Sequence, residues 1–289
     1  MFERIGRGFR MAGASWTVLK THPKLALFPA FSGLAFMALL AGIWAVAFGV
    51  NGADQLAARF DTHQPVIYVA LFAVYFLLTF VVLFFNAALV FCALECFAGR
   101  TPSLSAGLGA ATARIPQILG WTLLASTVGI LLSALQSFLR DRLGFIGSLI
   151  GGIGEMAWAA LTYFVVPVVI MEGVGPIKAV SRSSAILKST WGESVGGEGG
   201  MGMVSFFLML PVVLVIMVTV AINREAATPF AGGVVGTVMV LVVAYVLLLS
   251  IVFSALSTIF RTGVYVYATT GEAPAPMDAD MLRGSFRRK

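Results

Sequence analysis

Four polar side chains stand inside or at the ends of long apolar stretches, and they are the residues best placed to do chemistry. Glu155 is the first candidate for a functional role, because it follows a glycine-rich stretch within an apolar run. A carboxylate at the centre of a membrane-spanning helix costs about 2.5–3.5 kcal/mol on insertion scales, which protonation, a partner or water must offset. Two interpretations of Glu155 stay open: a proton or cation relay, or a carboxylate near the outer interface that hydrogen-bonds to a neighbouring helix.

The other three members of this candidate intramembrane polar site are Asn86, Glu95 and Glu172. An asparagine inside a span can hydrogen-bond across helices and fix their packing, or it can contact a substrate. We expect Glu95 to be an interfacial carboxylate at the cytoplasmic end of its span. Glu172 closes a span, where it can cap the helix or pair with Lys178 or Arg182.

Sequence motifs for catalysis or metal binding are missing. No HExxH, GxSxG or spaced Cys/His cluster occurs, so nothing brings together a nucleophile, a base and an orienting group. We therefore expect no enzyme activity, no cofactor and no metal. Cys92 and Cys96 lie in one apolar run and are predicted to be buried small hydrophobes. Residues 192–202 contain GxGxxG, but no strand precedes it, which favours a hinge or tight turn over a dinucleotide loop.

The elements that carry these residues follow from the composition. Of the 289 residues, 59% are hydrophobic and 11% are charged, and the mean hydropathy is +0.96. A soluble domain carries roughly 25% charged residues. The composition therefore excludes a water-soluble enzyme, a disordered chain and a free-standing nucleic-acid binder, and it indicates a multispanning membrane protein whose first partner is the lipid bilayer.

The apolar runs predict an all-α, polytopic bundle with about six spans. They lack the alternation of a barrel, and backbone polar groups cannot stay unpaired in lipid, so each span should be a helix. We expect one membrane domain over residues 1–262, a cytoplasmic tail over 263–289, and kinks at Pro167 and Pro211. Whether residues 143–155 cross fully or re-enter stays open. The spans are placed near 25–50, 66–97, 117–139, 146–171, 203–222 and 232–260.

The positive charges predict the orientation. With both termini inside, only four of the 19 Lys and Arg residues fall outside, and 15 lie on the cytoplasmic side. Cytoplasmic loops are the ones enriched in Lys and Arg, so both termini are predicted to be cytoplasmic. The four outer cations are Arg59, Arg140, Arg142 and Arg224.

Three cytoplasmic segments show amphipathic spacing that suits a helix lying in the membrane interface. This suggests three units, each an interfacial helix followed by two spans, although connectors beside membranes are often amphipathic in any case. Lipid-headgroup contact is predicted for Arg4, Arg7, Arg10, Lys178 and Arg182. The apolar stripes are Phe2, Ile5, Phe9, Ala12, Trp16 and Leu19, then Leu104, Leu108, Ala111, Ile115 and Ile118, then Ile177, Val180, Leu187 and Trp191.

Two GxxxG pairs, Gly147 with Gly151 and Gly232 with Gly236, stand near the predicted outer ends of two spans. Small residues at this spacing let two helices approach closely. We favour packing within one chain over dimerisation.

Several stretches together resemble a family of uncharacterised prokaryotic integral membrane proteins with about six spans. The resemblance implies a prokaryotic cytoplasmic (inner) membrane location, and it brings no activity, cofactor or catalytic residue. The stretches are Met1–Arg4 running to Ser15–Leu19 and Leu27–Pro29, then Ala179–Ser183 with Leu187 and Thr190–Glu193, then Tyr267–Glu272 with Leu282–Phe286.

The leading hypothesis is a non-catalytic membrane scaffold or accessory component with a membrane-protein partner or a homo-oligomeric state. The alternative is a small-solute or ion transporter or channel that uses Glu155 and Asn86. A lipid-modifying enzyme is a third, weaker hypothesis. Convergence of the four polar residues around one cavity would favour transport or catalysis, whereas scattered and locally satisfied residues would favour the scaffold.

Overall fold

The residues that the computed structural model describes, 13–49, 64–223 and 229–275, form helices joined by short turns and contain no strand. Within these ranges, six stretches are long and apolar enough to cross a membrane, close to the predicted positions. The predicted all-helical, six-span chain is confirmed at this level. The elements are a helical segment over 13–21, η1 (Pro23–Ala26), α2 (Leu27–Gly49), α4 (Gln64–Phe97), α5 (Leu104–Ala113), α6 (Ile115–Leu143), α7 (Phe145–Leu161), α8 (Val165–Glu172), α9 (Pro176–Asn223) and α10 (Pro229–Thr270).

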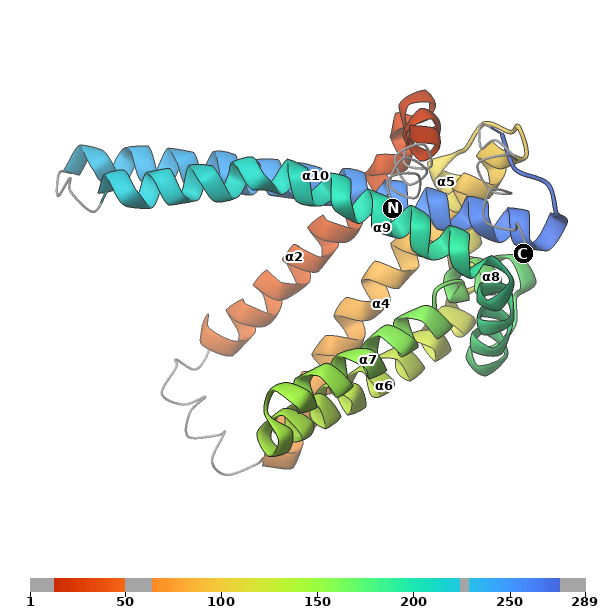
Figure 1. The fold of residues 1–289 in the computed structure, drawn as a ribbon, viewed down its shortest axis with the longest axis horizontal. Helices are drawn as coiled ribbons and strands as arrows, with labels where there is room; N and C mark the ends of the chain where they lie inside the picture. Colours follow the sequence, from red (N-terminus) through yellow and green to blue (C-terminus); the bar gives the residue numbers. More distant parts are fainter. Residues whose placement is uncertain (1–12, 50–63, 224–228, 276–289) are drawn as a thin grey trace.

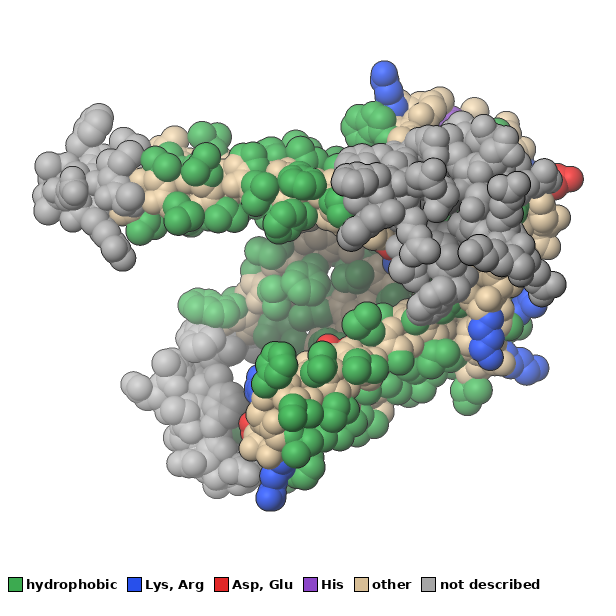
Figure 2. Space-filling model, viewed as in Figure 1, with side chains coloured by type: hydrophobic (Ala, Val, Ile, Leu, Met, Phe, Trp, Pro, Cys, Tyr) green, Lys and Arg blue, Asp and Glu red, His purple; other side chains and the backbone are tan. Residues whose placement is uncertain are grey.

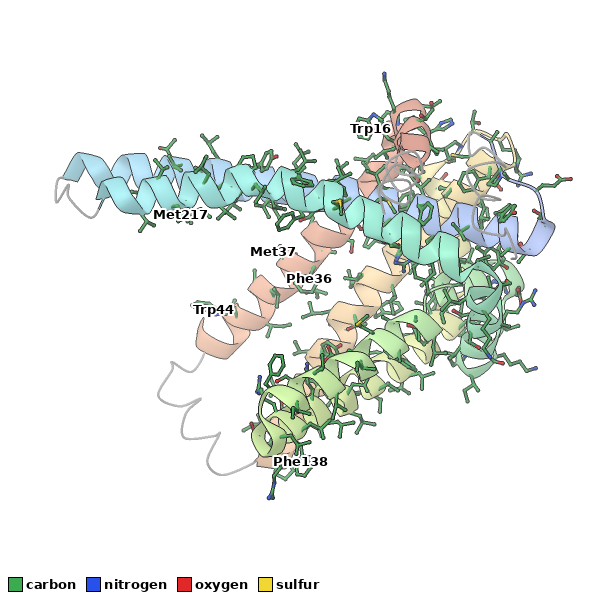
Figure 3. All side chains as sticks on the ribbon, in the orientation of Figure 1. Trp16, Phe36, Met37, Trp44, Phe138 and Met217 are labelled. Carbon is green, nitrogen blue, oxygen red and sulfur yellow. The ribbon has the colours of Figure 1, made fainter. Side chains whose placement is uncertain are left out.

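The long helices form three arms, α2 alone, α4 with α6 and α7, and α9 with α10, that spread from one shared end (Figure 1). The solvent-accessible surface is 17185 Å², whereas a compact chain of this mass exposes about 12,000 Å². The excess arises because the arms do not cover one another. Trp44, Phe138 and Met217 lie on three different arms, and each is more than half exposed (Figure 3).

Nearly all buried apolar side chains gather at the shared end, which we call the hub. Its centre is the second half of α4, where Ala87, Ala88 and Ala93 are fully buried. This helix contacts α2, α5, α6, α8 and α10. A Cβ added to Gly107 of α5 would lie 2.6 Å from Cys92 Sγ, so α5 packs on α4 with no room for a side chain. The hub consists of residues 14–28, 87–93, 107–121, 164–170, 179–190 and 255–265.

The α6–α7 hairpin is closed by glycines. Gly144 has a φ of +57°, a region that glycine tolerates, and it reverses the chain between the two helices. A Cβ on Gly147 would collide with the backbone of Leu139, and one on Gly151 would lie 2.5 Å from Gln136 Cγ. Residues 145–161 therefore run back along α6 as one helix, and the Gly147–Gly151 pair packs within the chain. At Gly236 an added Cβ would meet nothing within 4 Å, so no close approach occurs there.

The helix breaks fall partly where prolines predict them. Pro167 sits in the first turn of α8, where its missing N–H costs nothing, and residues 162–164 form the break before it. Pro211 lies inside α9 without such a break. The hinge predicted for residues 192–202 is wrong: this glycine-rich run is helical, and the kink of α9 is at Thr190, with φ −122° and ψ 21°.

Pro211 instead borders an apolar groove of about 390 Å³ between α9 and α10. Tyr245 lies in this groove and donates its hydroxyl proton to the carbonyl oxygen of Leu208, 3.0 Å away. That carbonyl stands three residues before the proline, where regular helix bonding is disturbed.

The predicted apolar stripes are only partly correct. Ala111 and Ile118 are buried as expected, but their stripe packs on the hub. Trp16 is 50% exposed and Ile177 is 78% exposed, so both lie outside the buried faces of their segments. The interfacial character of these segments stays a prediction. Arg4, Arg7, Arg10 and residues 276–289 lie outside the described residues, and the tail boundary predicted at 262 falls inside α10.

We expect Gly147→Ala to destabilise the protein by about 1–3 kcal/mol, because the new methyl group meets backbone that cannot step aside. Gly152→Ala is the matched control, since nothing lies within 4 Å of its added Cβ and alanine favours helix. The midpoint of thermal unfolding in mild detergent measures both. Equal midpoints for the two variants would contradict close packing at Gly147.

Candidate polar site at the hub

A cluster of polar side chains surrounds Glu198, a residue at the start of a candidate span. Three groups donate hydrogen bonds to its Oε1 atom: the Tyr163 hydroxyl at 3.0 Å, the Ser257 hydroxyl at 2.8 Å and the Arg261 guanidinium at 3.1 Å. The donors come from the α7–α8 junction and from α10, whereas Glu198 belongs to α9. One carboxylate oxygen therefore joins two arms.

The helix break before Pro167 brings Tyr163 into this cluster. Thr162 and Phe164 leave helical geometry, and the break frees backbone groups that need partners. The Phe164 N–H finds one in the hydroxyl oxygen of Ser183, a buried residue of α9, at 2.9 Å. The break is thus satisfied by α9, the helix that also supplies Glu198.

The Glu198–Arg261 ion pair is half-buried, with side chains 30% and 33% exposed. The guanidinium of Arg261 also lies over the Tyr163 ring, 4.3 Å from its centroid, which adds a cation–π attraction. Its Nε atom is buried and has no partner in the described part of the chain. Charges inside candidate spans are costly unless paired, and here each charge is neutralised by the other.

A second polar group lies along the same helix, α10. Thr258 donates a hydrogen bond to Asn86 Oδ1 of α4 at 3.2 Å, which is a bond between helices of the kind that an asparagine inside a span can make. The two residues line a small pocket with Ser32 of α2 and Ser254 of α10. Asn86 therefore joins α4 to α10 close to α2.

Sequence reasoning missed Glu198 and Arg261. Glu198 stands in the glycine-rich run interpreted as a hinge, and Arg261 lies one residue beyond the predicted end of the sixth span at 260, where it counts as a cytoplasmic charge. A signal was present in the sequence: polar residues from Ser254 to Thr262 recur at helical spacing inside an apolar run. In a span, that pattern indicates a helix face that meets other polar groups.

Two of the predicted carboxylates form ion pairs close to helix ends. Arg182 Nε lies 3.0 Å from Glu172, as expected, and Tyr265 also donates to this carboxylate at 3.2 Å. Arg100 forms two hydrogen bonds of 2.6 Å with Glu95. These bonds raise the pKa of Arg182 and of Arg100 above its ordinary value, chiefly because the carboxylate holds the guanidinium proton.

Glu155 differs from the other three residues. It is exposed on α7, and within the described ranges no hydrogen bond or ion pair reaches it. The expected bond to a neighbouring helix is therefore not present there. Asn86, Glu95, Glu155 and Glu172 thus do not converge: each belongs to a separate local environment.

The cysteines and the acidic residues do not form a metal site in the described ranges, where no group of three His, Cys, Asp or Glu side chains is arranged to hold an ion. Cys92 is buried and Cys96 is half-buried, as predicted for small hydrophobes, and both are free thiols. Cys92 donates a weak hydrogen bond to the Ser103 carbonyl at 3.3 Å.

Comparison with known proteins gives one match. Residues 65–275 match a family described as a family of unknown function, DUF6159. The matched range contains the whole Glu198 cluster and ends near the last residues of α10. Neither the curated proteins nor the solved structures contain a significant match to the chain.

We expect Glu198→Gln to destabilise the protein by about 1–3 kcal/mol, because Arg261 then keeps a half-buried charge without its partner. Glu95→Gln is the control, since its partner Arg100 is 63% exposed and water can solvate the guanidinium when the bond is lost, so this pair should contribute less than about 1 kcal/mol. Adding Arg261→Met to Glu198→Gln should recover part of the loss. Thermal unfolding of both single variants and the double variant in mild detergent gives the coupling free energy between Glu198 and Arg261 as a double-mutant cycle. Equal losses of stability in Glu198→Gln and Glu95→Gln would contradict the contribution expected of the Glu198–Arg261 pair.

Proposed function

Because the chain belongs to the DUF6159 family of unknown function and its described residues include six helices apolar enough to cross a bilayer, we propose that it is a non-catalytic membrane scaffold or accessory component. The observation that carries this proposal is the scatter of the polar residues. Asn86, Glu95 and Glu172 each have a local partner, and Glu155 stands apart on α7. A substrate path or an active site needs such groups to converge, whereas a scaffold needs only that its charges be neutralised.

The exposed arms supply the surface that a scaffold needs. On the face shown in Figure 2, apolar side chains cover the arms along their length. Large residues such as Leu34, Met217 and Val240 are more than 60% exposed. In a bilayer these faces meet lipid or the helices of another membrane protein. A membrane-protein partner or a second copy of the chain between the arms is the arrangement that we propose.

The hub supports a role at the cytoplasmic interface of a prokaryotic inner membrane. Lys178 and Lys188 are exposed on the first segment of α9, beside the exposed Ile177. Cations next to an exposed apolar side chain suit contact with anionic headgroups. Arg182 also lies on this segment of α9, but its charge is paired with Glu172. Arg4, Arg7 and Arg10, outside the described residues, are included in the proposed contact.

The orientation with both termini in the cytoplasm is part of the same proposal. Lys20, Lys24, Lys178 and Arg182 belong to segments at the hub, whereas Arg142 stands in the last turn of α6, next to the turn into α7. A majority of cations at one membrane face favours the cytoplasmic side for that face.

Mass measurement of the intact particle tests the scaffold proposal. Purified from native membranes in mild detergent, the chain should travel with a stoichiometric foreign subunit, because its arms present apolar faces on which the helices of a partner can pack. A chain that travels alone, with no other subunit and no second copy, would contradict the proposal. Re-extraction in a harsher detergent is the control, since it should release the partner and leave the chain behind.

A transporter or channel is the second candidate, and the Glu198 cluster is the observation that favours it. A charged pair inside candidate spans beside a broken helix is a common setting for a coupling ion or proton. In this second proposal, the residue that would bind the ion or proton is Glu198 instead of Glu155.

Flux into liposomes decides between the two candidates. For a scaffold, purified protein in liposomes should pass neither protons nor monovalent cations above the lipid background, with or without Glu198→Gln. If flux appears and Glu198→Gln lowers it tenfold or more while Glu95→Gln leaves it unchanged, the scaffold proposal fails. Circular dichroism of each reconstituted variant checks that the helices are intact.

A further inference from the structure

The pocket beside Asn86 is a polar cavity where three helices meet. It has a volume of about 40 Å³ and lies within candidate spans of α2, α4 and α10. Its polar walls are Asn86, Thr258, Ser32 and Ser254, and its apolar walls include Pro29 and Leu89. The apolar groove at Pro211 has no comparable polar lining.

Several polar groups of this pocket have hydrogen-bonding capacity left over. Thr258 uses the Oδ1 atom of Asn86, which leaves both N–H bonds of the amide without an acceptor in the described part of the chain. The hydroxyls of Ser32 and Ser254 likewise have no partner within the described ranges. A donor left unpaired away from water costs about 1–3 kcal/mol. Asn86 and Ser32 are partly buried and Ser254 is exposed on α10, so within a bilayer these four donors need an occupant of the pocket that accepts hydrogen bonds.

The size of the cavity determines which occupant fits. One water needs about 10–15 Å³ of such volume and two to four polar partners. A pocket of about 40 Å³ therefore holds about three waters. A lipid acyl chain would fill the space but would leave every donor unpaired, and no charged side chain lines the pocket to bind an ion.

We propose that this pocket is a water-binding site within the spans, and that its water joins α2 to the Asn86–Thr258 pair. The amide of Asn86 donates to the water, and the hydroxyls of Ser32 and Ser254 complete its partners. The α2 arm touches α4 mostly through apolar side chains, so this water is the polar link between them. The proposal does not rest on the function proposed above, because a scaffold and a transporter can both contain it.

Reactivity of single cysteines in native membranes tests the site. In a background of Cys92→Ala and Cys96→Ala, Ser32→Cys and Ser254→Cys are treated with hydrogen peroxide, a reagent close to water in size. The thiolate attacks one peroxide oxygen, displaces hydroxide and becomes a sulfenic acid, and the thiolate forms only where water reaches the sulfur. The controls are Leu34→Cys and Leu248→Cys, on the same two helices, whose parent side chains are 67% and 60% exposed.

We expect both pocket cysteines to react at least tenfold faster than their controls. Filling the pocket with Asn86→Leu should then remove that excess from Ser254→Cys, because the apolar side chain displaces the water. Equal rates at pocket and control positions would overturn the proposal. So would an excess that persists in Asn86→Leu, since water would then reach the cysteine by another route. Each variant is used only if it elutes as the parent particle does.

Discussion

Close packing around the second half of α4 is the constraint on which the rest of the structure depends. In a bilayer the hydrophobic effect does not drive helices together, so association relies on close packing and on hydrogen bonds between helices. Ala87, Ala88 and Ala93 supply the small surface that lets α2, α5, α8 and α10 approach. Gly107 completes it from α5. The arms extend from this region, and α4 also packs along α6 farther out, where Tyr75 lies close to Gly129.

Polar bonds add direction to this packing. Apolar contacts between helices can slide or rotate at small cost, whereas a hydrogen bond fixes one atom against another. Glu198 joins α9 to α10 and to the α7–α8 break, and Asn86 joins α4 to α10. The Glu198 cluster and the Asn86–Thr258 pair both include residues of α10, so this helix is the common partner of α4 and of the α7–α8 break. The distribution of polar residues therefore follows the helix junctions rather than a path across the membrane.

The sequence was sufficient for the helices but not for the partners of their polar residues. Apolar runs have the length of a bilayer crossing, which made the six spans predictable, and Pro167 marked the α7–α8 break. Glycine was the misleading residue, because residues 192–202 are helical and the α9 kink falls at Thr190. The Glu198–Arg261 pair is 63 positions apart in the chain, and only folding brings its members together.

Because each arm is held at one end only, a small tilt at that end moves its far tip through a larger distance. From Glu198 to the last residue of α9 the helix rises about 38 Å, at 1.5 Å per residue. A tilt of about 5° at the anchored end would therefore move the far tip by about 3 Å, by the same geometry. A small adjustment of packing on one side of the bilayer is thus amplified on the other side. The distance between the far tips of the arms therefore depends on how their anchored ends are packed at the hub.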